Sequence, residues 1–335
     1  MNGSNVHGIV GDSKQIQNVL KMVEQVAGTH ATVLIRGETG SGKELVALAL
    51  HHSSARAGHP FVVVDCASIH ENLLQSELFG HERGAYTGAV GAKHGLFEAA
   101  HRGTLFLDEI AELTPALQVK LLRVLETGTF RRVGGTADVH VDVRLVAATN
   151  RELEAMIEEG GFREDLFYRL NAFPIDIPPL RDRLEDIPSL ARHFIGMTET
   201  PGVEVSDAAM ERLLAYRWPG NVRELAHAIE RALILCGGGP IEAEHLPARV
   251  QHDEVARAGT KEESLLSLHE LELRHILRVL DEHRGHREHA ASALGISERT
   301  LYRRLKETQV LHEPAGHHGG AAHGTHPAPL EPLET

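Results

Sequence analysis

One glycine-rich segment of the sequence has the residue types and spacing of a phosphate-binding loop. It fits the pattern GxxxxGK and consists of Gly37, Glu38, Thr39, Gly40, Ser41, Gly42 and Lys43. Glycines let consecutive backbone N–H groups curl around a phosphate, and the ammonium group of Lys43 supplies positive charge to the outer phosphates. An apolar run precedes the segment and a helical pattern follows it, which favours this interpretation over an ordinary strand–helix turn. Glu44 comes next, where most such loops place the Ser or Thr that holds Mg²⁺.

A second segment ends in two carboxylates that complement the phosphate loop. Residues 104–107 form a mostly apolar run that is followed directly by Asp108 and Glu109. Asp108 is predicted to help hold Mg²⁺, and Glu109 to orient or polarise an attacking water. The alternative, a helix N-cap, is disfavoured by the phosphate loop upstream. After another apolar run, Asn150 is predicted to contact the γ-phosphate or the water.

These side chains need a scaffold of strands that alternate with helices, and the hydrophobic pattern predicts one. Short apolar runs occur at 31–36, 61–64, 104–107 and 143–147. Helical spacing occurs at 44–52, 72–78 and 115–126, after an N-terminal helix that Asp12 or Ser13 can cap. The alternation predicts an α/β fold with a parallel sheet covered by helices on both faces. After two prolines at 178 and 179, helical periodicity from 186 to 236 predicts a small all-helical subdomain.

Composition limits the class of protein. The chain has 335 residues, 42% of them hydrophobic, which excludes wholesale disorder and suggests roughly two or three domains. Its formal net charge of −13 excludes a uniformly basic binder of nucleic acid but leaves room for a local basic patch. Only two cysteines are present, and no apolar run approaches the roughly 18 residues of a membrane span. We therefore expect a soluble, cytoplasmic protein without a disulfide scaffold or a membrane partner.

The pattern of residues 290–306 predicts a helix-turn-helix. Gly295 permits the tight turn, and Ser297 can cap the second helix. Basic residues outnumber acidic ones between 284 and 306, so the second helix fits the major groove of double-stranded DNA. The candidate DNA-binding residues are Ser297, Arg299, Thr300, Arg303, Arg304 and Lys306. The alternative is a solvated basic helix face in a small bundle.

Together these motifs resemble those of the sigma-54-dependent transcription activators, the bacterial enhancer-binding proteins of the AAA+ ATPase class. The resemblance extends from about residue 8 to residue 310, and Glu44 agrees with it. Its most specific part is similar to the GAFTGA loop with which this family contacts the sigma factor, and consists of Gly84, Ala85, Tyr86, Thr87, Gly88 and Ala89. Residues 128–135 resemble the second pore loop of the family.

The resemblance also implies roles for three arginines and one aspartate. Arg163 and Arg169 match the segment that supplies arginine fingers to the active site of a neighbouring subunit. Arg223, in the segment WPGNVREL, would sense nucleotide in its own subunit. Asp65 stands where the family often has an Asn that engages the catalytic glutamate as a switch. If Asp65 faces Glu109, the two carboxylates would repel each other.

The resemblance implies an ATPase, with ATP and Mg²⁺ as ligands, that binds enhancer-like DNA. It would remodel the closed complex of sigma-54 and RNA polymerase into an open complex, as a homo-oligomer between a dimer and a hexameric ring. Two alternatives remain open. One is another AAA+ remodelling ATPase. The other is a DNA-binding repressor with the same fold and a weak or uncoupled ATPase, and it remains open because Asp65 replaces the Asn that the family often has as a switch.

The expected domains follow from these motifs. They are an AAA+ α/β subdomain at 7–177, a helical lid at 178–250, a linker at 251–264, a Fis-type helix-turn-helix domain at 265–311 and a disordered tail at 312–335. The tail is rich in His, Pro and Gly, but its histidines have no spacing that indicates a metal site. The phosphate loop lies close to Met1, so we expect no regulatory domain before it.

Overall fold

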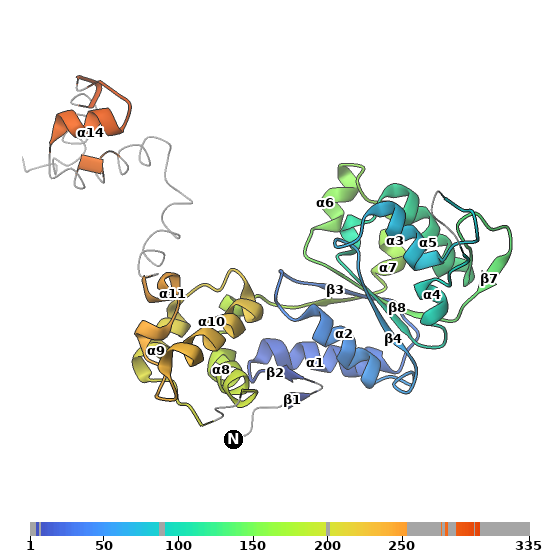
Figure 1. Ribbon diagram of the computed structural model, residues 1–335, viewed down its shortest axis with the longest axis horizontal. Helices are drawn as coiled ribbons and strands as arrows, with labels where there is room; N and C mark the ends of the chain where they lie inside the picture. Colours follow the sequence, from blue (N-terminus) through green and yellow to red (C-terminus); the bar gives the residue numbers. More distant parts are fainter. Residues whose placement is uncertain are drawn as a thin grey trace, which may run out of the picture. The chain divides into compact units, whose positions relative to one another are not determined.

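The chain forms two compact units, Met1–Asp253 and Glu254–Thr335. The computed structural model describes residues 5–6, 8–86, 91–198, 202–252, 276, 279–280, 286–297 and 299–301 (Figure 1). Most of the expected linker and all of the tail at 312–335 lie outside these residues. None of the helices in the described ranges is long and apolar enough to cross a lipid bilayer.

A five-stranded parallel sheet forms the centre of the first unit, with the strand order β4-β5-β8-β3-β9. Its strands are β3 (Val33–Arg36), β4 (Phe61–Asp65), β5 (Thr104–Asp108), β8 (Arg144–Thr149) and β9 (Phe173–Asp176). The first four coincide with the predicted apolar runs, and the parallel sheet is confirmed, whereas β9 has no counterpart in the sequence prediction. In β5, Leu105 and Leu107 pack into one core and Phe106 into another, because side chains alternate between the faces of a strand.

Helices cover both faces of the sheet, as the alternation predicts (Figure 1). One face packs against α1 (Lys14–Ala27) and α2 (Lys43–His52). The other face packs against α3 (Glu71–Phe79), α4 (Leu96–Ala99), α5 (Pro115–Thr127), α6 (Leu153–Glu158) and α7 (Glu164–Leu170). Ser13 caps α1, since its Oγ accepts a hydrogen bond from the N–H of Ile16 at 3.3 Å.

A helical lid follows the sheet in the same unit. It contains α8 (Ile187–Gly196), α9 (Asp207–Ala215), α10 (Asn221–Cys236) and α11 (Ala248–His252), with the 3₁₀ turns η2 (Leu180–Asp182), η3 (Leu184–Asp186) and η4 (Ala243–His245). Trp218 is fully buried at its centre and donates its indole N–H to the carbonyl of Leu213 at 2.8 Å. The helical subdomain is as expected, but Pro219 and Gly220 separate α9 from α10, so the helical pattern is not continuous.

The shortest elements have no counterpart in the sequence prediction. They are the antiparallel pairs β1 (Asn5–Val6) with β2 (Ile9–Val10) and β6 (Thr129–Arg131) with β7 (Asp138–His140), and the 3₁₀ turn η1 (Ile110–Glu112). Segments of two or three residues are too short to show a hydrophobic period.

The described part of the second unit contains the first helix and the turn of the predicted helix-turn-helix. Helix α14 (Arg287–Ala293) is followed by Gly295, whose φ of 66° lies in the left-handed region that glycine adopts freely. Ser297 then accepts the N–H of Thr300 on its Oγ at 3.2 Å, which is the geometry of a helix N-cap. Leu301 is buried with Ile276, Ala290 and Ala291, all within a small apolar core.

A buried histidine under the sheet makes the stability of the first unit depend on pH. His51 is 3% exposed and its Nδ1 lies 3.0 Å from Thr104 Oγ1. Burial lowers the pKa of His51 below its ordinary value of 6.5, and the charges of His52, Arg144 and His59 act in the same direction, whereas a backbone hydrogen bond at His59 opposes them.

Because the unfolded chain takes up this proton first, the free energy of unfolding should fall as the pH is lowered below 6.5. The slope due to one proton is at most about 1.4 kcal/mol per pH unit. We expect His51→Gln to remove this contribution, so the wild-type and variant curves of unfolding free energy against pH should converge from pH 7 towards pH 5. Curves that stay parallel over that range would show that His51 is not the titrating group.

Candidate active site

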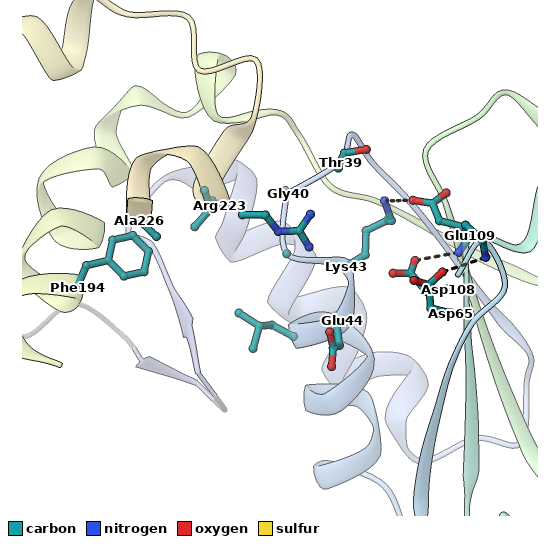
Figure 2. A pocket seen from close by; sticks show the side chains of 14 residues that line it. Thr39, Gly40, Lys43, Glu44, Asp65, Asp108, Glu109, Phe194, Arg223 and Ala226 are labelled. Atoms are coloured by element: carbon teal, nitrogen blue, oxygen red, sulfur yellow. Dashed lines mark hydrogen bonds and ion pairs between the residues drawn. The ribbon is translucent and has the colours of Figure 1, made fainter. Parts of the chain in front are cut away.

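The phosphate loop connects β3 to α2 and opens into the pocket that we call the central pocket. It has a volume of about 460 Å³ and receives side chains from the loop, from the ends of β4 and β5, and from the lid (Figure 2). Gly42 has a φ of 105° at the start of α2, and Gly40 a φ of 77°. Gly40 also lies so close to the carbonyl of Gly220 that a Cβ atom would collide with it. Both positions therefore favour glycine for their backbone conformation, and Gly40 also for its close approach to the lid.

Lys43 joins the loop to the predicted catalytic carboxylate. It is 6% exposed, and its Nζ donates to the carbonyl of Gly37 at 3.1 Å and to Glu109 Oε1 at 3.3 Å. The other oxygen, Glu109 Oε2, accepts the N–H of Asn150 at 3.3 Å, and Asn150 Nδ2 donates to Thr39 Oγ1 at 3.0 Å. Side chains from the loop, β5 and the end of β8 therefore meet at one edge of the sheet, as the sequence predicts for parallel strands.

Two further carboxylates line the central pocket beside Glu109. Asp65 and Asp108 are register partners at the ends of β4 and β5. Asp108 Oδ1 accepts the N–H of Glu109 at 3.0 Å, and Asp65 Oδ1 accepts the N–H of Ala67 at 2.9 Å. Burial, together with the charges of Asp65, Asp108 and Glu109, raises the pKa of the neighbouring Cys66 thiol to about 12. Figure 2 shows Asp65 beside Asp108, while the carboxylate of Glu109 is engaged by Lys43.

The carboxylates fit Mg²⁺ bound together with a nucleotide. No group of three or more His, Cys, Asp or Glu side chains in the described ranges could hold a metal ion by itself. Mg²⁺ is usually held by one or two carboxylates together with phosphate oxygens and water, so a complete protein cage is not needed. Asp108 lines the central pocket with the phosphate loop, and Asp65 lines the same pocket with a second carboxylate, so the donor set fits such an ion.

The lid holds the phosphate loop through several polar contacts. Arg181 donates two hydrogen bonds to Glu38, at 2.9 Å and 2.7 Å, and Asn221 Nδ2 donates to Glu38 Oε2 at 3.0 Å. The hydrogen bonds from Arg181 and then from Asn221 lower the pKa of Glu38, so this side chain stays ionised. Arg223, from α10, lines the central pocket, and its backbone N–H donates to the carbonyl of Gly40 at 3.3 Å. Arg181 and Asn221 were not among the candidate residues of the sequence.

Some of the predicted nucleotide-binding residues line other pockets and not the central pocket. Those that line it are Thr39, Gly40, Gly42, Lys43, Glu44 and Arg223. Gly37, Glu38 and Asn150 line a smaller adjacent pocket of about 220 Å³ instead. Ser41 faces a third pocket, which is apolar, and is 4% exposed. Residues of the phosphate loop therefore line all three pockets.

The apolar pocket is a feature that sequence reasoning missed. It has a volume of about 80 Å³, shares Gly42, Leu45, Phe194 and Val222 with the central pocket, and is also lined by Ile9, Val10 and Ile177. An apolar slot that continues a phosphate site fits the flat base of a nucleotide. No motif marks these residues as a group, because they come from β2, the phosphate loop, α2, the end of β9, α8 and α10 and meet only in the folded chain.

The two candidate arginine fingers lie away from the central pocket. Arg163 precedes α7, and its side chain is exposed and paired with Asp165, at 3.0 Å from Nε and 2.6 Å from Nη2. Arg169 is also exposed and donates from Nη2 to the carbonyl of Leu125 at 2.8 Å. Neither residue lines any of the three pockets described above. Their placement is compatible with action on another subunit and not on their own.

The segment that resembles the GAFTGA loop is described only as far as Tyr86, and Thr87, Gly88 and Ala89 lie outside the described residues. Tyr86 is 44% exposed, and its ring meets that of His81 edge-on with 5.2 Å between the centroids. Arg132, one of residues 128–135, donates to Glu82 at 2.9 Å, just before this segment, and to Glu98 at 2.7 Å. Burial would raise the pKa of Glu98, but the hydrogen bonds from Arg132, His94 and Gly95 outweigh it and lower this pKa to about 2.

The candidate DNA-binding residues are described in part. Ser297 and Thr300 form the N-cap of the second helix, and Arg299 is exposed. Arg303, Arg304 and Lys306 lie outside the described residues.

Comparisons with known proteins agree with this arrangement. Residues 9–176 match the family described as the sigma-54 interaction domain. The chain belongs to this family. Residues 181–263 match the AAA+ ATPase lid domain, and residues 267–307 match the Fis family of bacterial regulatory proteins. The resemblance to the sigma-54-dependent activators and the AAA+ fold with a helical lid are thereby confirmed.

Individual members of the sigma-54 interaction family are similar over most of this chain. The regulatory protein AtoC of Escherichia coli (strain K12) is 46% identical over 309 residues, which cover 89% of this chain and 67% of AtoC. The nitrogen fixation protein VnfA of Azotobacter vinelandii is 47% identical over 302 residues, covering 89% of this chain and 58% of VnfA. A crystal structure of NtrX from Brucella abortus has a TM-score of 0.69 at 37% identity, covering 90% of this chain and 69% of that one. NtrX structures have also been solved in complex with ADP and with ATP.

Proposed function

We propose that this protein is a sigma-54-dependent transcriptional activator that binds enhancer-like DNA. It uses ATP hydrolysis to remodel the closed complex of sigma-54 RNA polymerase into the open complex. The observation that carries the proposal is the convergence of Lys43, Glu109, Asn150 and Arg223 on one edge of the sheet, in a chain that also has the sigma-54 interaction domain and a Fis-type module.

The residues of the site divide the work of hydrolysis. The ammonium group of Lys43 binds the outer phosphates, and the N–H groups of the phosphate loop hold them in place. Mg²⁺, held by Asp108 with Asp65 nearby, would neutralise phosphate charge when bound. Glu109 orients the attacking water and accepts its proton, and Asn150 holds Glu109 in place through its N–H. Arg223 contacts the nucleotide from the lid and couples lid position to the state of the site.

The apolar pocket supports ATP as the nucleotide. It lies beside the central pocket and shares four lining residues with it, so the base and the phosphates of one molecule can occupy both. The NtrX complexes with ADP and ATP support the same assignment for this chain.

The assembly of subunits completes the site. Arg163 and Arg169 are exposed and lie outside the central pocket, so a second copy of the chain would have to supply them. We propose a homo-oligomer, a hexameric ring by resemblance to the family, in which each nucleotide lies between two subunits. The guanidinium group from the neighbour would stabilise charge on the transferred phosphoryl group.

The test of this function measures ATP hydrolysis separately from the opening of promoter DNA. Thr87→Ala is expected to hydrolyse ATP at close to the wild-type rate and yet fail to open promoter DNA. The physical reason is that the described residues of its loop, 84–86, do not line the central pocket, and the adjacent Glu82 is bound by Arg132. The measurement is a transcription assay on a sigma-54 promoter, with ATPase activity and DNA binding measured in parallel.

Tyr86→Phe is the matched control, because it keeps the ring that meets His81 and removes only a hydroxyl group. It should support transcription. If Thr87→Ala activated transcription as well as the wild type does, this loop would not couple ATPase activity to the polymerase. A wild-type protein that binds DNA but does not activate transcription would make a repressor with an uncoupled ATPase the better description.

A further inference from the structure

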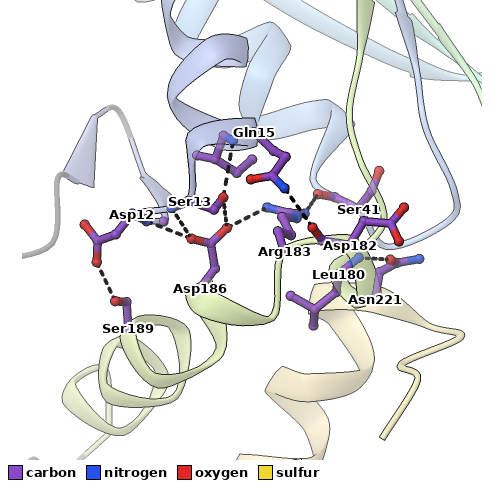
Figure 3. A network of polar contacts seen from close by, with 12 residues as sticks. Asp12, Ser13, Gln15, Ser41, Leu180, Asp182, Arg183, Asp186, Ser189 and Asn221 are labelled. Atoms are coloured by element: carbon purple, nitrogen blue, oxygen red, sulfur yellow. Dashed lines mark hydrogen bonds and ion pairs between the residues drawn. The ribbon is translucent and has the colours of Figure 1, made fainter. Parts of the chain in front are cut away.

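Two buried charged residues of the lid lie next to the phosphate loop but outside the central pocket. Arg183, between η2 and η3, is 3% exposed, and Asp186, the last residue of η3, is fully buried (Figure 3). Charged side chains are costly to bury, so such residues are held by specific partners. The partners of these two residues belong to different parts of the chain.

Asp186 binds the N-terminal segment 11–13. Its Oδ1 accepts the N–H groups of Asp12 and Ser13, both at 2.7 Å, and its Oδ2 accepts the hydroxyl of Ser13 at 2.8 Å. A Cβ atom on Gly11 would lie 2.9 Å from this carboxyl group, so the segment approaches as closely as glycine allows. Ser189 adds a hydrogen bond to Asp12 Oδ2 at 2.7 Å. The start of α1 is therefore fixed on the lid.

Arg183 binds the phosphate loop. Its Nη2 donates to the carbonyl of Ser41 at 3.0 Å, and its Nη1 lies 3.9 Å from Asp186 Oδ2. Arg183 Nε is buried without a hydrogen-bond partner in the described part of the chain. Burial lowers the pKa of this guanidinium group, and Asp186 opposes that shift. The side chain thus has one strong contact, which is the loop carbonyl.

The geometry of the peptide bond gives this contact a consequence for phosphate binding. The carbonyl of Ser41 and the N–H of Gly42 belong to the same planar peptide group and point in opposite directions. When Arg183 fixes the Ser41 carbonyl toward the lid, the N–H of Gly42 is directed away from it, and Gly42 lines the central pocket. The orientation of one donor of the phosphate cradle therefore depends on a residue outside the central pocket, although Arg183 also borders the apolar pocket.

We infer that Arg183 and Asp186 are positioning residues for the phosphate loop, and that they make nucleotide affinity depend on the docking of segment 11–13 on the lid. The N-terminal segment holds Asp186, Asp186 faces Arg183, and Arg183 fixes the orientation of the peptide group between Ser41 and Gly42. The inference rests on the proposed binding of a nucleotide at this loop. It assigns a role in that binding to Ser13, which lies at the start of α1 and does not line the central pocket.

The experiment is a double-mutant cycle on nucleotide affinity in the full-length protein, with fluorescent mant-ADP as the probe. Ser13→Ala should raise the Kd about threefold or more, and Arg183→Gln about tenfold. If both changes act through the same contacts, Ser13→Ala should have no further effect in the Arg183→Gln background. The melting temperature of each variant is measured in parallel.

Ser206→Ala is the matched control for Ser13→Ala. Ser206 caps α9 as Ser13 caps α1, with an Oγ that accepts an N–H at 3.3 Å in both cases. The two changes therefore remove the same kind of cap, but only Ser13 contacts Asp186. Ser206→Ala should lower the melting temperature and leave the Kd unchanged.

Three results would overturn the inference: an unchanged Kd in Ser13→Ala, an equal change in Ser206→Ala, or additive effects of Ser13→Ala and Arg183→Gln. Should Arg183→Gln fail to fold, the comparison of Ser13→Ala with Ser206→Ala still decides the question. Failure of the proposed function is distinguishable, because in that case the wild-type protein itself would not bind mant-ADP.

Discussion

Glu109→Gln is expected to lower the kcat for ATP hydrolysis by about 10²–10⁴-fold while the protein still binds ATP. Glutamine keeps the size of the side chain, and its one carbonyl oxygen can still accept a hydrogen bond from either Lys43 or the N–H of Asn150, but it cannot accept the proton of the attacking water. Hydrolysis is measured at saturating ATP with the oligomeric state monitored, and binding is measured with a fluorescent nucleotide.

Two variants frame this result. Lys43→Ala should lose nucleotide binding itself, because the outer phosphates lose their cationic partner. Glu112→Gln is the matched control, since Glu112 lies three residues further along and pairs with Arg151 at the surface. It should hydrolyse ATP like the wild type. Equal hydrolysis by Glu109→Gln and the wild type would remove Glu109 from the chemistry.

Arg163→Ala is expected to lower the kcat of the assembled protein by about 10³-fold or more, which is the effect typical of an arginine finger. The side chain of Arg163 is paired with Asp165 two residues away and lies outside the central pocket of its own chain, so a role as a finger would require a neighbouring subunit. Activity per subunit should therefore rise with protein concentration. Arg169→Ala should show which of the two arginines carries the larger share.

A mixing experiment tests action across the interface. Lys43→Ala protein has an intact Arg163 but no working site, whereas Arg163→Ala protein has an intact site. Mixed together, the two should recover part of the activity that each lacks alone. The control is Arg192→Ala, which removes an exposed arginine that donates to the carbonyl of Pro188 within α8. If the specific activity stayed constant on dilution and no activity were recovered on mixing, Arg163 would not act as a finger on a neighbouring subunit.

The sequence predicts those parts of the site whose residues lie close together along the chain. The phosphate loop follows an apolar strand, and Asp108 and Glu109 follow another, so their position at one edge of a parallel sheet could be expected. Strand β9 could not, because Pro174 lies inside it and proline disfavours a strand. Proline is tolerated there because β9 is the outermost strand of the sheet and needs a partner on one side only.

The lid contacts could not be predicted from local patterns. Arg181 and Glu38 are separated by 143 residues, and Arg183 and Ser41 by 142. Arg183 and Asp186 read as ordinary charged residues in a polar turn, and only the folded chain shows that both are buried. Phe194 follows the helical period of α8, which predicts burial in a core but not a place beside the central pocket.

Glu109 has a backbone conformation that other side chains would adopt more readily. Its φ of 50° and ψ of 52° lie in the left-handed region, which costs a residue other than glycine, asparagine or aspartate about 1 kcal/mol. Selection for stability alone would favour glycine or asparagine at this position, and such a protein would be more robust and inactive. A design that stabilises this chain by choosing the best residue for each backbone conformation should therefore leave Glu109 unchanged.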